Sequence, residues 1–524
     1  MDALDQSHPI EVEVPHARSV LEFFDYISYK KGSAIIRMLQ DFIGDCIFQK
    51  SLSSYMKRYA RRNAKTEDLW SVLSEESGLQ VNVMMDTWTK QKGYPVIFVK
   101  SKDHILEFEQ SHFMLSGLHG DGQWIVPITL SVGSYNKRKN FLLDTKVGRL
   151  DVSELLHSPD GNSSSFEKKN LEMCDENLWI KLNIEQTGFY RVKYEDKLAA
   201  RLKKAIEKNW LLEADKFGIL DDTYALCEAC ELPLSSLLTL MDVYRKELDC
   251  IVLSKLIDIC YNIATISADA IPNLTKELKQ FFIYLLLSSA ERLGWESMCG
   301  ESHLSTMLRE RVLMALAMFG HDETHKEAMK RFQTFLDDRN TPLLPVDTRR
   351  AAYIAVMRDA STINRNGFES LLNVYREADA VQEKTRILRC MASSPDPNIV
   401  LEVLNLLFSD EVREQDVNYV LLGICSEGRE AAWTWFKENW DRILNKWGPM
   451  LLTRFVRDIV TPFCSDEKAD EIEEFFKSRV NRSIAMTLKQ SVEQVRIKAR
   501  WVHNIKHEHD QSLEELVRGL ACRG

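Results

Sequence analysis

The sequence predicts a multidomain α+β protein, in which a helical N-terminal segment precedes a small β-sandwich and a large α-solenoid. The chain has 524 residues, which exceeds the length that one hydrophobic core usually supports. The spacing of apolar residues changes from the helical period of about 3.6 to the strand period of about 2 at Gly93-Tyr-Pro95. After Glu195 nearly every segment has the pattern of an amphipathic helix. We therefore expect domains over residues 1–92, 93–194 and 195–524.

Residues 1–92 have the pattern of a helical domain. Thr66, followed by Glu67 and Asp68, is typical of a helix N-cap and an acidic first turn. Another helix is predicted over residues 33–44, where Gly44 stops it. Apolar residues recur in it at helical spacing: Ile35, Ile36, Leu39, Phe42 and Ile43.

Residues 93–194 predict a β-sandwich of short strands. Turn residues such as Asp121-Gly122 and Asp160-Gly-Asn162 separate the apolar runs. A domain of about 95 residues is within the usual size range. The apolar positions are Val96, Phe98, Leu106, Phe108, Phe113, Ile125, Ile128, Leu130, Leu142 and the run Leu178-Trp-Ile-Lys-Leu182.

The C-terminal region predicts antiparallel helix pairs that follow one another. Their spacing of about 35 to 40 residues resembles that of HEAT or armadillo units. Because the sequence identity between the pairs is weak, we expect an α-solenoid rather than a strict repeat array. The pairs are predicted over residues 309–318 with 323–336, 347–357 with 367–375, and 380–392 with 397–408.

Composition argues against several classes of protein. The formal charge of −10, with no basic block, argues against a nucleic-acid-binding protein. The chain has no N-terminal apolar targeting segment, and the longest apolar run, Phe281-Phe-Ile-Tyr-Leu-Leu-Leu287, is too short to cross a bilayer. We expect no transmembrane segment. Eleven cysteines, odd in number and irregularly spaced, predict free thiols in a reducing cytosol rather than a disulfide framework.

The most specific motif of the chain is Asp25-Tyr-Ile-Ser-Tyr-Lys-Lys-Gly32. A second motif is Trp88-Thr-Lys-Gln-Lys-Gly-Tyr-Pro-Val96. The further motif segments are Gln123-Trp-Ile-Val-Pro-Ile-Thr129, Gln186-Thr-Gly-Phe-Tyr-Arg-Val-Lys-Tyr194, Leu293-Gly-Trp295, Gly300-Glu-Ser302 and Leu308-Arg309. Together they resemble the gluzincin zinc aminopeptidases, of the puromycin-sensitive and plant aminopeptidase M type.

This resemblance implies both a fold and a chemistry. Residues 1–92 would be the C-terminal part of a thermolysin-like catalytic domain. In it, Tyr29 would donate a hydrogen bond to the oxyanion that forms when a zinc-bound water attacks a peptide carbonyl. The family binds zinc through H-E-x-x-H and a downstream Glu, and the substrate's amino group through G-A-M-E-N. Neither motif occurs in the sequence, and residues 1–14 resemble the stretch that follows them.

The chain is therefore expected to be the C-terminal portion of a zinc aminopeptidase that removes N-terminal residues from peptides. Zinc is expected for the full-length family, and none bound by this chain alone, which would then be inactive. In the family, arginines of the helical domain are thought to receive the substrate's C-terminal carboxylate, and their bidentate fork suits that task. The candidates are Arg386, Arg454 and Arg457. Ordinary surface ion pairing is the alternative for each.

Three other groups of residues resemble metal-binding or redox motifs, but an ordinary structural role is favoured for each. His321-Asp-Glu-Thr-His325 has the spacing of two zinc ligands, but its Glu is misplaced for catalysis, and we expect an interhelix loop with Asp322 as the N-cap. His503, His507 and His509, with Glu508 and Asp510, suggest adventitious Zn or Ni binding, although a solvated terminus is favoured. Cys227-Glu-Ala-Cys230 is expected on a helix as buried apolar residues.

Several alternatives remain open at this point. The chain could instead be a non-catalytic α-solenoid that binds peptides or proteins, since solenoids offer extended concave surfaces. A separate polypeptide could supply the missing N-terminal half, or the sequence could be a gene model that starts late. The expected partner is a peptide substrate or that missing half. The chain could also form a homodimer, and we expect it not to bind nucleic acid. The expected location is the cytoplasm, with peripheral association with microsomal membranes a further option.

Overall fold

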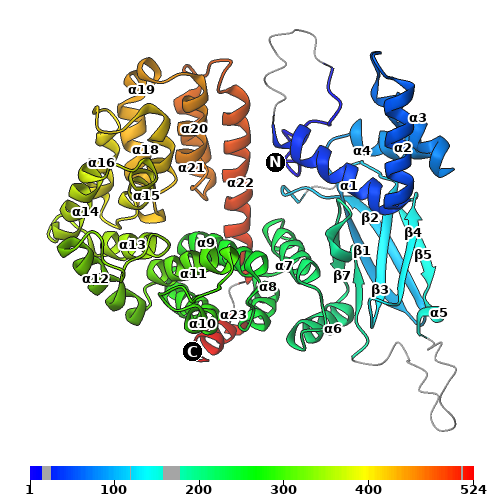
Figure 1. Cartoon of the computed structure of the whole chain (residues 1–524), viewed down its shortest axis with the longest axis horizontal. Helices are drawn as coiled ribbons and strands as arrows, with labels where there is room; N and C mark the ends of the chain where they lie inside the picture. Colours follow the sequence, from blue (N-terminus) through cyan, green and yellow to red (C-terminus); the bar gives the residue numbers. More distant parts are fainter. Residues whose placement is uncertain (14–24, 118–119, 157–176, 509–510, 524) are drawn as a thin grey trace. The chain divides into compact units, whose positions relative to one another are not determined.

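The structure is a computed structural model, and it describes residues 1–13, 25–117, 120–156, 177–508 and 511–523. The described chain is mostly helical with small β-sheets, in agreement with the predicted mixture of elements (Figure 1). It separates into an N-terminal unit, Met1–Glu231, and a C-terminal unit, Leu232–Gly524. The three domains expected from the sequence remain a prediction.

The helices of the N-terminal unit flank its two sheets. Helix α3 begins at Thr66, whereas the predicted N-cap was Thr66 itself. The cap residue is Lys65, whose backbone N–H donates to the Asp68 carboxylate at 2.8 Å. The helices are α1 (Gly32–Ile43), α2 (Asp45–Arg58), α3 (Thr66–Ser77), α4 (Val81–Thr89), α5 (Ser153–Leu156), α6 (Asp196–Glu207) and α7 (Glu213–Glu228).

Seven strands of the N-terminal unit form a four-stranded sheet in the order β5-β2-β1-β7 and a three-stranded sheet in the order β4-β3-β6. β1 and β7 pair in parallel, and every other pair is antiparallel. The predicted turn Asp160-Gly-Asn162 lies outside the described residues. The strands are β1 (Pro95–Lys102), β2 (Ile105–His112), β3 (Val126–Val132), β4 (Arg138–Leu143), β5 (Val147–Asp151), β6 (Ile180–Leu182) and β7 (Arg191–Tyr194).

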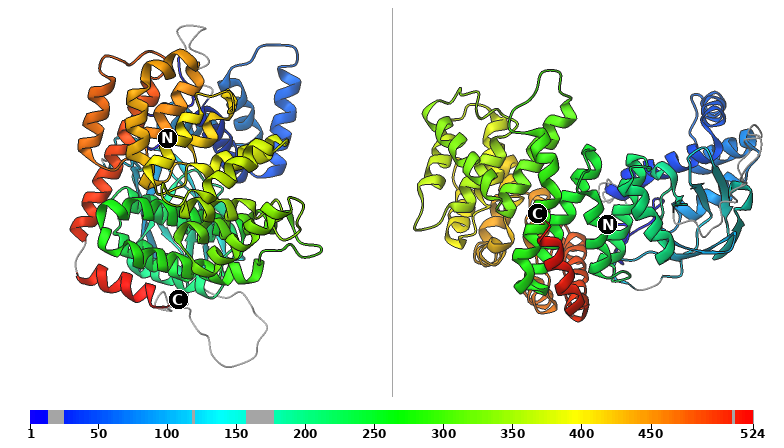
Figure 2. Two further views of the ribbon diagram at one scale, coloured as in Figure 1. Left: turned by 90° about the vertical axis from the view of Figure 1, so that its left-hand side faces the viewer. Right: turned by 90° about the horizontal axis from the view of Figure 1, so that it is seen from below.

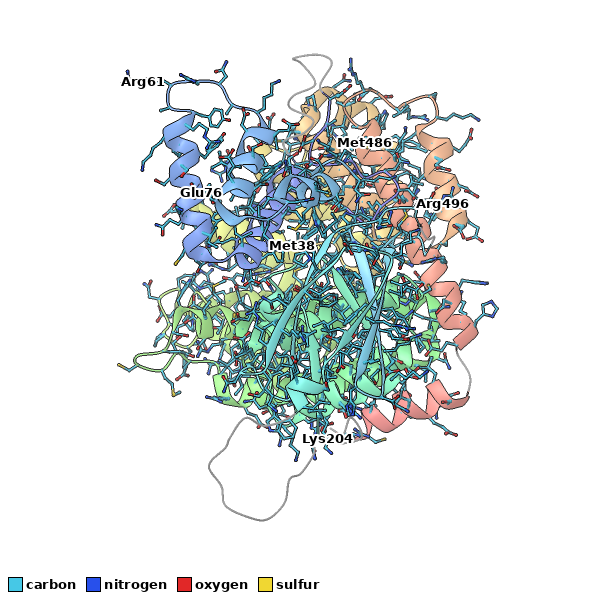
Figure 3. The ribbon with its side chains drawn as sticks, turned by 90° about the vertical axis from the view of Figure 1, so that its right-hand side faces the viewer. Met38, Arg61, Glu76, Lys204, Met486 and Arg496 are labelled. Atoms are coloured by element: carbon cyan, nitrogen blue, oxygen red, sulfur yellow. The ribbon has the colours of Figure 1, made fainter. Side chains whose placement is uncertain are left out.

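Helices α1, α3 and α4 share one hydrophobic core with both sheets. Trp88 of α4 is fully buried, and its indole N–H donates to the carbonyl of Ile125 at 2.9 Å. In α1 the sulfur of Met38, labelled in Figure 3, lies 3.5 Å from the backbone N of Phe189. The apolar face of α1 therefore packs against residues that follow it by more than a hundred positions.

The described part of the C-terminal unit consists of helices, and helices lie at all six predicted positions, as α11 and α12, α13 and α14, and α15 and α16. The long helices are α9 (Cys250–Ala270), α10 (Thr275–Leu293), α11 (His303–Phe319), α12 (Asp322–Asp337), α13 (Arg349–Asp359), α14 (Asn366–Glu377), α15 (Val381–Met391), α16 (Pro397–Leu406), α18 (Arg429–Glu438), α20 (Pro449–Val460), α21 (Asp466–Phe476), α22 (Ala485–Glu508) and α23 (Gln511–Ala521). The shorter helices are α8 (Leu234–Met241), α17 (Val417–Leu421) and α19 (Trp440–Lys446).

These helices pack in a regular succession (Figure 2). α11 contacts α13, α13 contacts α15, α15 contacts α17, α17 contacts α20, and α20 contacts α22, while α12, α14 and α21 each pack on a member of this series. Between α21 and α22, Arg496, labelled in Figure 3, binds Asp470 at 2.8 Å and Glu473 at 2.7 Å. The helices of this series thus pack mainly on near neighbours in the sequence, whereas α22 also packs on α9 and α23 packs on α10.

Helix α9 is long and apolar enough to cross a membrane by length and composition alone. Half of its apolar window is buried inside the structure, and α9 packs on α10, α11 and α22. Core helices of globular proteins have the same length and composition. The prediction of no transmembrane segment rests on the length of uninterrupted apolar runs. Helix α9 contains no long uninterrupted run, because Lys255 and Asp258 lie within it.

Candidate functional site

Tyr29 lies on a short π-helix, η2 (Ile27–Lys31), which leads directly into α1. The Asp25 carboxylate shapes the first turn, because its Oδ1 accepts hydrogen bonds from the backbone N–H groups of Ile27 at 3.0 Å and Ser28 at 2.9 Å. The backbone N–H of Tyr29 then donates to the carbonyl of Asp25 at 3.2 Å. The Tyr29 side chain is 60% exposed. Single turns of π-helix inside or beside α-helices occur frequently at functional sites.

His8 contacts the second carboxylate oxygen of Asp25. The Nε2 atom of His8 lies 2.7 Å from Asp25 Oδ2, and its Nδ1 lies 2.7 Å from the carbonyl oxygen of Pro9. Because both ring nitrogens face an oxygen, the imidazolium form can donate a hydrogen bond at each. In that form His8 and Asp25 make a half-buried ion pair that fixes the start of the π-helix.

Lys31 anchors the other end of the π-helix. Its side chain is buried, and its Nζ lies 3.0 Å from Asp2 Oδ2 and donates to the carbonyl of Gly93 at 2.8 Å. The Phe189 ring centroid lies 5.9 Å from the same ammonium. Burial lowers the pKa of Lys31, and the Asp2 carboxylate partly offsets that effect. The segment that carries Tyr29 is thus held at one end by the contact of His8 with Asp25 and at the other by Lys31 with Asp2, while Tyr29 itself is 60% exposed.

The described residues bring together no group of three His, Cys, Asp or Glu side chains that could hold a metal ion. A catalytic zinc needs three protein ligands and an open position. The part of the chain that the structure describes therefore does not fit a zinc site, and Tyr29 is the one predicted catalytic group it presents.

The histidines of His321-Asp-Glu-Thr-His325 point to different partners. His321 Nδ1 lies 2.9 Å from Thr324 Oγ1, and His325 Nε2 lies 2.8 Å from Asp359 Oδ2. The predicted loop with Asp322 as its cap is wrong by one residue. Helix α12 begins at Asp322 with His321 as the N-cap, so His325 lies on the helix.

His503 and His507 lie one turn apart on the exposed face of α22, with their Nε2 atoms 2.8 Å apart. Glu508 is engaged elsewhere, since its carboxylate accepts hydrogen bonds from the backbone N–H groups of Leu234 at 2.7 Å and Ser235 at 2.9 Å. It caps the N-terminus of α8. His509 and Asp510 lie outside the described residues. The pair of histidines is therefore solvated, as predicted.

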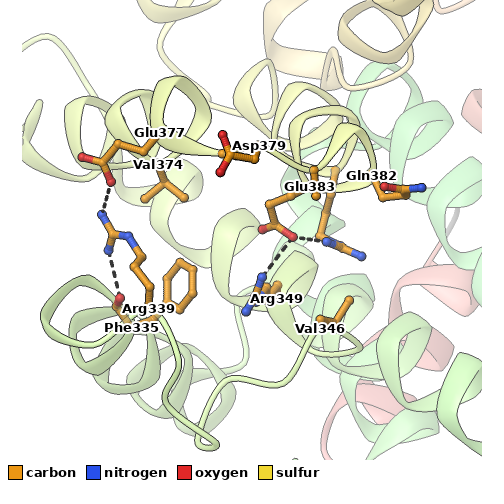
Figure 4. Close-up of a pocket in the computed structure, with 12 residues that line it drawn as sticks. Phe335, Arg339, Val346, Arg349, Val374, Glu377, Asp379, Gln382 and Glu383 are labelled. Atoms are coloured by element: carbon orange, nitrogen blue, oxygen red, sulfur yellow. Dashed lines mark hydrogen bonds and ion pairs between the residues drawn. The ribbon is translucent and has the colours of Figure 1, made fainter.

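The three candidate arginines have different surroundings. Arg386 of α15 lines a pocket (Figure 4) and forms an ion pair with Glu383. Arg457 of α20 binds the neighbouring Asp458 at 2.8 Å. Arg454 of α20 is half-buried and has no hydrogen bond or ion pair to any residue that the structure describes.

Cysteines provide no further candidate. Cys227 is fully buried on α7, as predicted, whereas Cys230 follows the end of that helix with a left-handed backbone. No disulfide joins the ten described cysteines. Burial raises the pKa of Cys260, Cys390 and Cys464, which opposes formation of a reactive thiolate.

Sequence reasoning missed the residues that position Tyr29. Asp25 could have been identified, because an Asp two or three residues before helical N–H groups is typical of an N-terminal cap. Nothing local in the sequence indicated His8, Asp2 or the burial of Lys31, because those contacts join residues far apart in the chain.

Two protein-family models match the chain. Residues 179–497 match the model of the ERAP1-like C-terminal domain, and residues 1–88 match the model of the peptidase family M1 domain. The chain belongs to the M1 aminopeptidase family. Its match is to the C-terminal portion of that family, as the motifs predicted.

The relatives are named aminopeptidases. The chain is 55% identical over 522 residues to Aminopeptidase M1 of Arabidopsis thaliana, covering 99% of this chain and 58% of the relative. It is 50% identical over 521 residues to Aminopeptidase M1-B of Oryza sativa subsp. japonica, again covering 99% and 58%. Against Puromycin-sensitive aminopeptidase of Caenorhabditis elegans it is 30% identical over 539 residues, covering 99% and 54%. The chain thus spans little more than half the length of these M1 relatives, whose family implies zinc in the full-length proteins.

Proposed function

We propose that this chain contributes to an M1 aminopeptidase that removes N-terminal residues from peptides, and that Tyr29 is its oxyanion donor. The observation that carries the proposal is the placement of Tyr29. Tyr29 is 60% exposed and lies on a π-helix fixed at one end by Asp25 and at the other by Lys31. A donor held in position before the reaction costs little reorganisation when charge develops on the substrate.

The proposed step concerns the scissile carbonyl. When a nucleophile attacks that carbon, the oxygen gains negative charge, and the Tyr29 hydroxyl donates a hydrogen bond to it while keeping its proton. Zinc, where the family's H-E-x-x-H and downstream Glu hold it, would act as a Lewis acid on the same centre. The described residues offer no such ligand set. We therefore infer that this chain alone is inactive and that another part of the protein, or another polypeptide, supplies the metal and the G-A-M-E-N segment.

We also propose that the two sheets form the β-sandwich and the helix pairs the α-solenoid expected from the sequence. Phe108 of one sheet and Phe141 of the other place their ring centroids 4.9 Å apart, which supports face-to-face packing of the sheets. The succession of contacts from α11 to α22 supports a solenoid. In such a cap, we propose Arg454 as the group that receives a peptide carboxylate, because it is half-buried and has no acidic partner among the described residues.

The predicted location and partners are part of this proposal. Free cysteines support a reducing compartment such as the cytoplasm. Peripheral association with microsomal membranes, a homodimer, and a peptide substrate or a separately made N-terminal half as partner remain proposals. The non-catalytic binding module is not favoured, because the relatives compared above carry the names of aminopeptidases.

The test is reconstitution. The chain is fused behind the N-terminal portion of the Arabidopsis relative, and hydrolysis of aminoacyl-anilides and zinc content are measured for the fusion and for the chain alone. We expect zinc-dependent hydrolysis from the fusion, and neither bound stoichiometric zinc nor hydrolysis from the chain alone. Chelator-sensitive activity of the chain alone would contradict the proposal, as would a folded, zinc-loaded fusion that is inactive.

A further inference from the structure

A pocket of about 410 Å³ lies within the C-terminal unit, between the ends of α12 and α14 and the beginnings of α13 and α15 (Figure 4). Pockets of this volume commonly hold small organic molecules. Its apolar part includes Phe335 and Val346, and its charged side chains are three arginines and three carboxylates. Because every lining residue belongs to this unit, the pocket is a property of the helical array itself.

Two arginines of the pocket share one carboxylate. Arg349 Nη1 donates to Glu383 Oε2 at 3.1 Å, and Arg386 Nη1 donates to the same oxygen. The other oxygen, Glu383 Oε1, accepts a hydrogen bond of 2.6 Å from the buried Tyr353 hydroxyl. Burial and the Glu383 charge raise the pKa of Tyr353, so its hydroxyl stays a donor. Both carboxylate oxygens of Glu383 therefore already accept hydrogen bonds, and its single negative charge faces the positive charges of two arginines.

The guanidinium groups of this pair retain unused donors. Each guanidinium has five N–H groups. Among the described residues, Arg386 donates hydrogen bonds to Glu383 alone. Arg349 donates to Glu383 and, from its Nε, to the carbonyl of Leu344 at 3.4 Å. Their side chains are only 16% and 18% exposed, so water screens their surplus charge less than it would at the open surface. Helices α13 and α15 also begin here without a side-chain cap, which adds positive potential.

The other charged groups of the pocket oppose this surplus only weakly. Glu377 is neutralised by Arg339, which it binds at 3.0 Å (Figure 4). Asp379 lies on the loop before α15, where its carboxylate is exposed and well screened. Phe335 lies beside the pair, with the Arg349 guanidinium 4.6 Å and the Arg339 guanidinium 5.2 Å from its ring centroid.

We propose that this pocket is a binding site for a small organic carboxylate with an apolar body, whose carboxylate is received by Arg349 and Arg386 and whose body lies on Phe335. Arginine recognises a carboxylate through paired, charge-assisted hydrogen bonds. An apolar body gains free energy on leaving water for the Phe335 side of the pocket. The site is independent of the proposed hydrolytic centre, because it needs neither Tyr29 nor a metal.

The test measures binding of 3-phenylpropionate to the whole chain by isothermal titration calorimetry. The neutral 3-phenylpropanamide is the matched ligand, and inorganic phosphate is the competitor. We expect saturable binding at one site per chain, with the amide at least about tenfold weaker, since one charge-assisted hydrogen bond accounts for about that factor. Phosphate at the same concentration should not displace the acid. Equal binding of acid and amide, or displacement by phosphate alone, would overturn the proposal.

Two substitutions with opposite expected effects on affinity test the roles of Arg386 and Glu383. Arg386→Gln should weaken 3-phenylpropionate about tenfold, whereas Glu383→Gln, which removes the competing negative charge, should tighten it several-fold. The matched control is Arg376→Gln on neighbouring α14, which breaks the exposed ion pair of Arg376 with Glu411 and should leave binding unchanged. If Arg386→Gln fails to fold, Glu383→Gln decides, because misfolding does not produce tighter binding. Unchanged or weaker binding by Glu383→Gln would refute the assignment.

Discussion

Arg309 binds both carboxylate oxygens of Glu301 from one guanidinium nitrogen, at 2.6 Å each. The same fully buried side chain donates to the carbonyl of Leu293 at 3.1 Å and to the Ser297 hydroxyl at 3.0 Å. The three short motifs Leu293-Gly-Trp295, Gly300-Glu-Ser302 and Leu308-Arg309 therefore meet at one guanidinium. Their role in the structure is to fasten the loop between α10 and α11.

Arg309→Met should destabilise the C-terminal unit, because it leaves the Leu293 carbonyl and other polar groups of the loop without their donor. Loss of a buried, multiply bonded charged side chain costs about 3 kcal/mol of unfolding free energy. Urea denaturation measures the change. Arg292→Met, at an exposed position on the last turn of α10, is the control and should have little effect. Equal stability of the two variants would show that the clamp is unimportant.

Tyr29→Phe should lower the turnover number of the reconstituted fusion about 10²–10³-fold, because it removes one oxyanion donor. The Michaelis constant should hardly change, since the hydrogen bond strengthens only as charge develops. Steady-state kinetics on aminoacyl-anilides provides both values. Tyr26→Phe is a matched control, because Tyr26 is 61% exposed against 60% for Tyr29 and lies in the same segment. Undiminished turnover of the Tyr29→Phe fusion would remove Tyr29 from the mechanism.

Lys31→Met should destabilise the N-terminal unit by about 3 kcal/mol, since it leaves the Asp2 carboxylate without its buried partner. Lys30→Met replaces the exposed neighbour and should cost little. Chemical denaturation followed by tryptophan fluorescence compares the two variants. If both behave alike, the buried pair does not anchor the Tyr29 segment.

Glu471 should contribute stability that disappears in acid. Partial burial opposes its ionisation, but hydrogen bonds from Lys437, Lys468 and the Trp433 indole outweigh that effect and lower its pKa from 4.5 to about 2. The unfolded chain therefore binds the proton more tightly than the folded one. Stability from Glu471 is present above about pH 4.5 and is lost as the pH falls toward 2.

The measurement is the unfolding free energy as a function of pH. Between about pH 4.5 and 2 the Glu471→Gln variant should lose stability less steeply than the parent chain. Because the carboxylate is partly exposed, the difference should be modest. Glu438→Gln, at an exposed position on α18, should keep the parent slope. Identical slopes for both variants would contradict the assignment.

The periodicity of apolar residues was sufficient to predict most elements. In α14, Phe368, Leu371 and Tyr375 are buried at helical spacing, and the predicted helix lies inside the observed bounds. Helix starts were less accurate. At α3 and α12 the cap is the residue before the predicted one, because Lys65 and His321 have extended backbones that no local preference of their side chains indicates.

The candidate site was predictable only where it was local. Tyr29 came from a contiguous motif, and the ion pair of Arg386 with Glu383 could have been inferred from their spacing of three residues on one helix. Contacts across long separations could not be inferred. The hydrogen bond from Lys31 to Gly93 spans 62 residues, and the cap that Glu508 provides for Leu234 spans 274. Sequence periodicity identifies the buried face of a helix but not the residue that covers it.

The distance in sequence between α1 and its partners has a consequence for synthesis on the ribosome. Met38 and Phe189, which lie in contact, are separated by 151 residues. At translation rates of about 5–20 residues per second, the apolar face of α1 waits roughly 8 to 30 seconds for the strand region that covers it. During that interval the nascent helix exposes Ile35, Met38 and Leu39, which are buried in the folded unit. Nascent chains at this stage should therefore be the form most prone to aggregation and most in need of a chaperone.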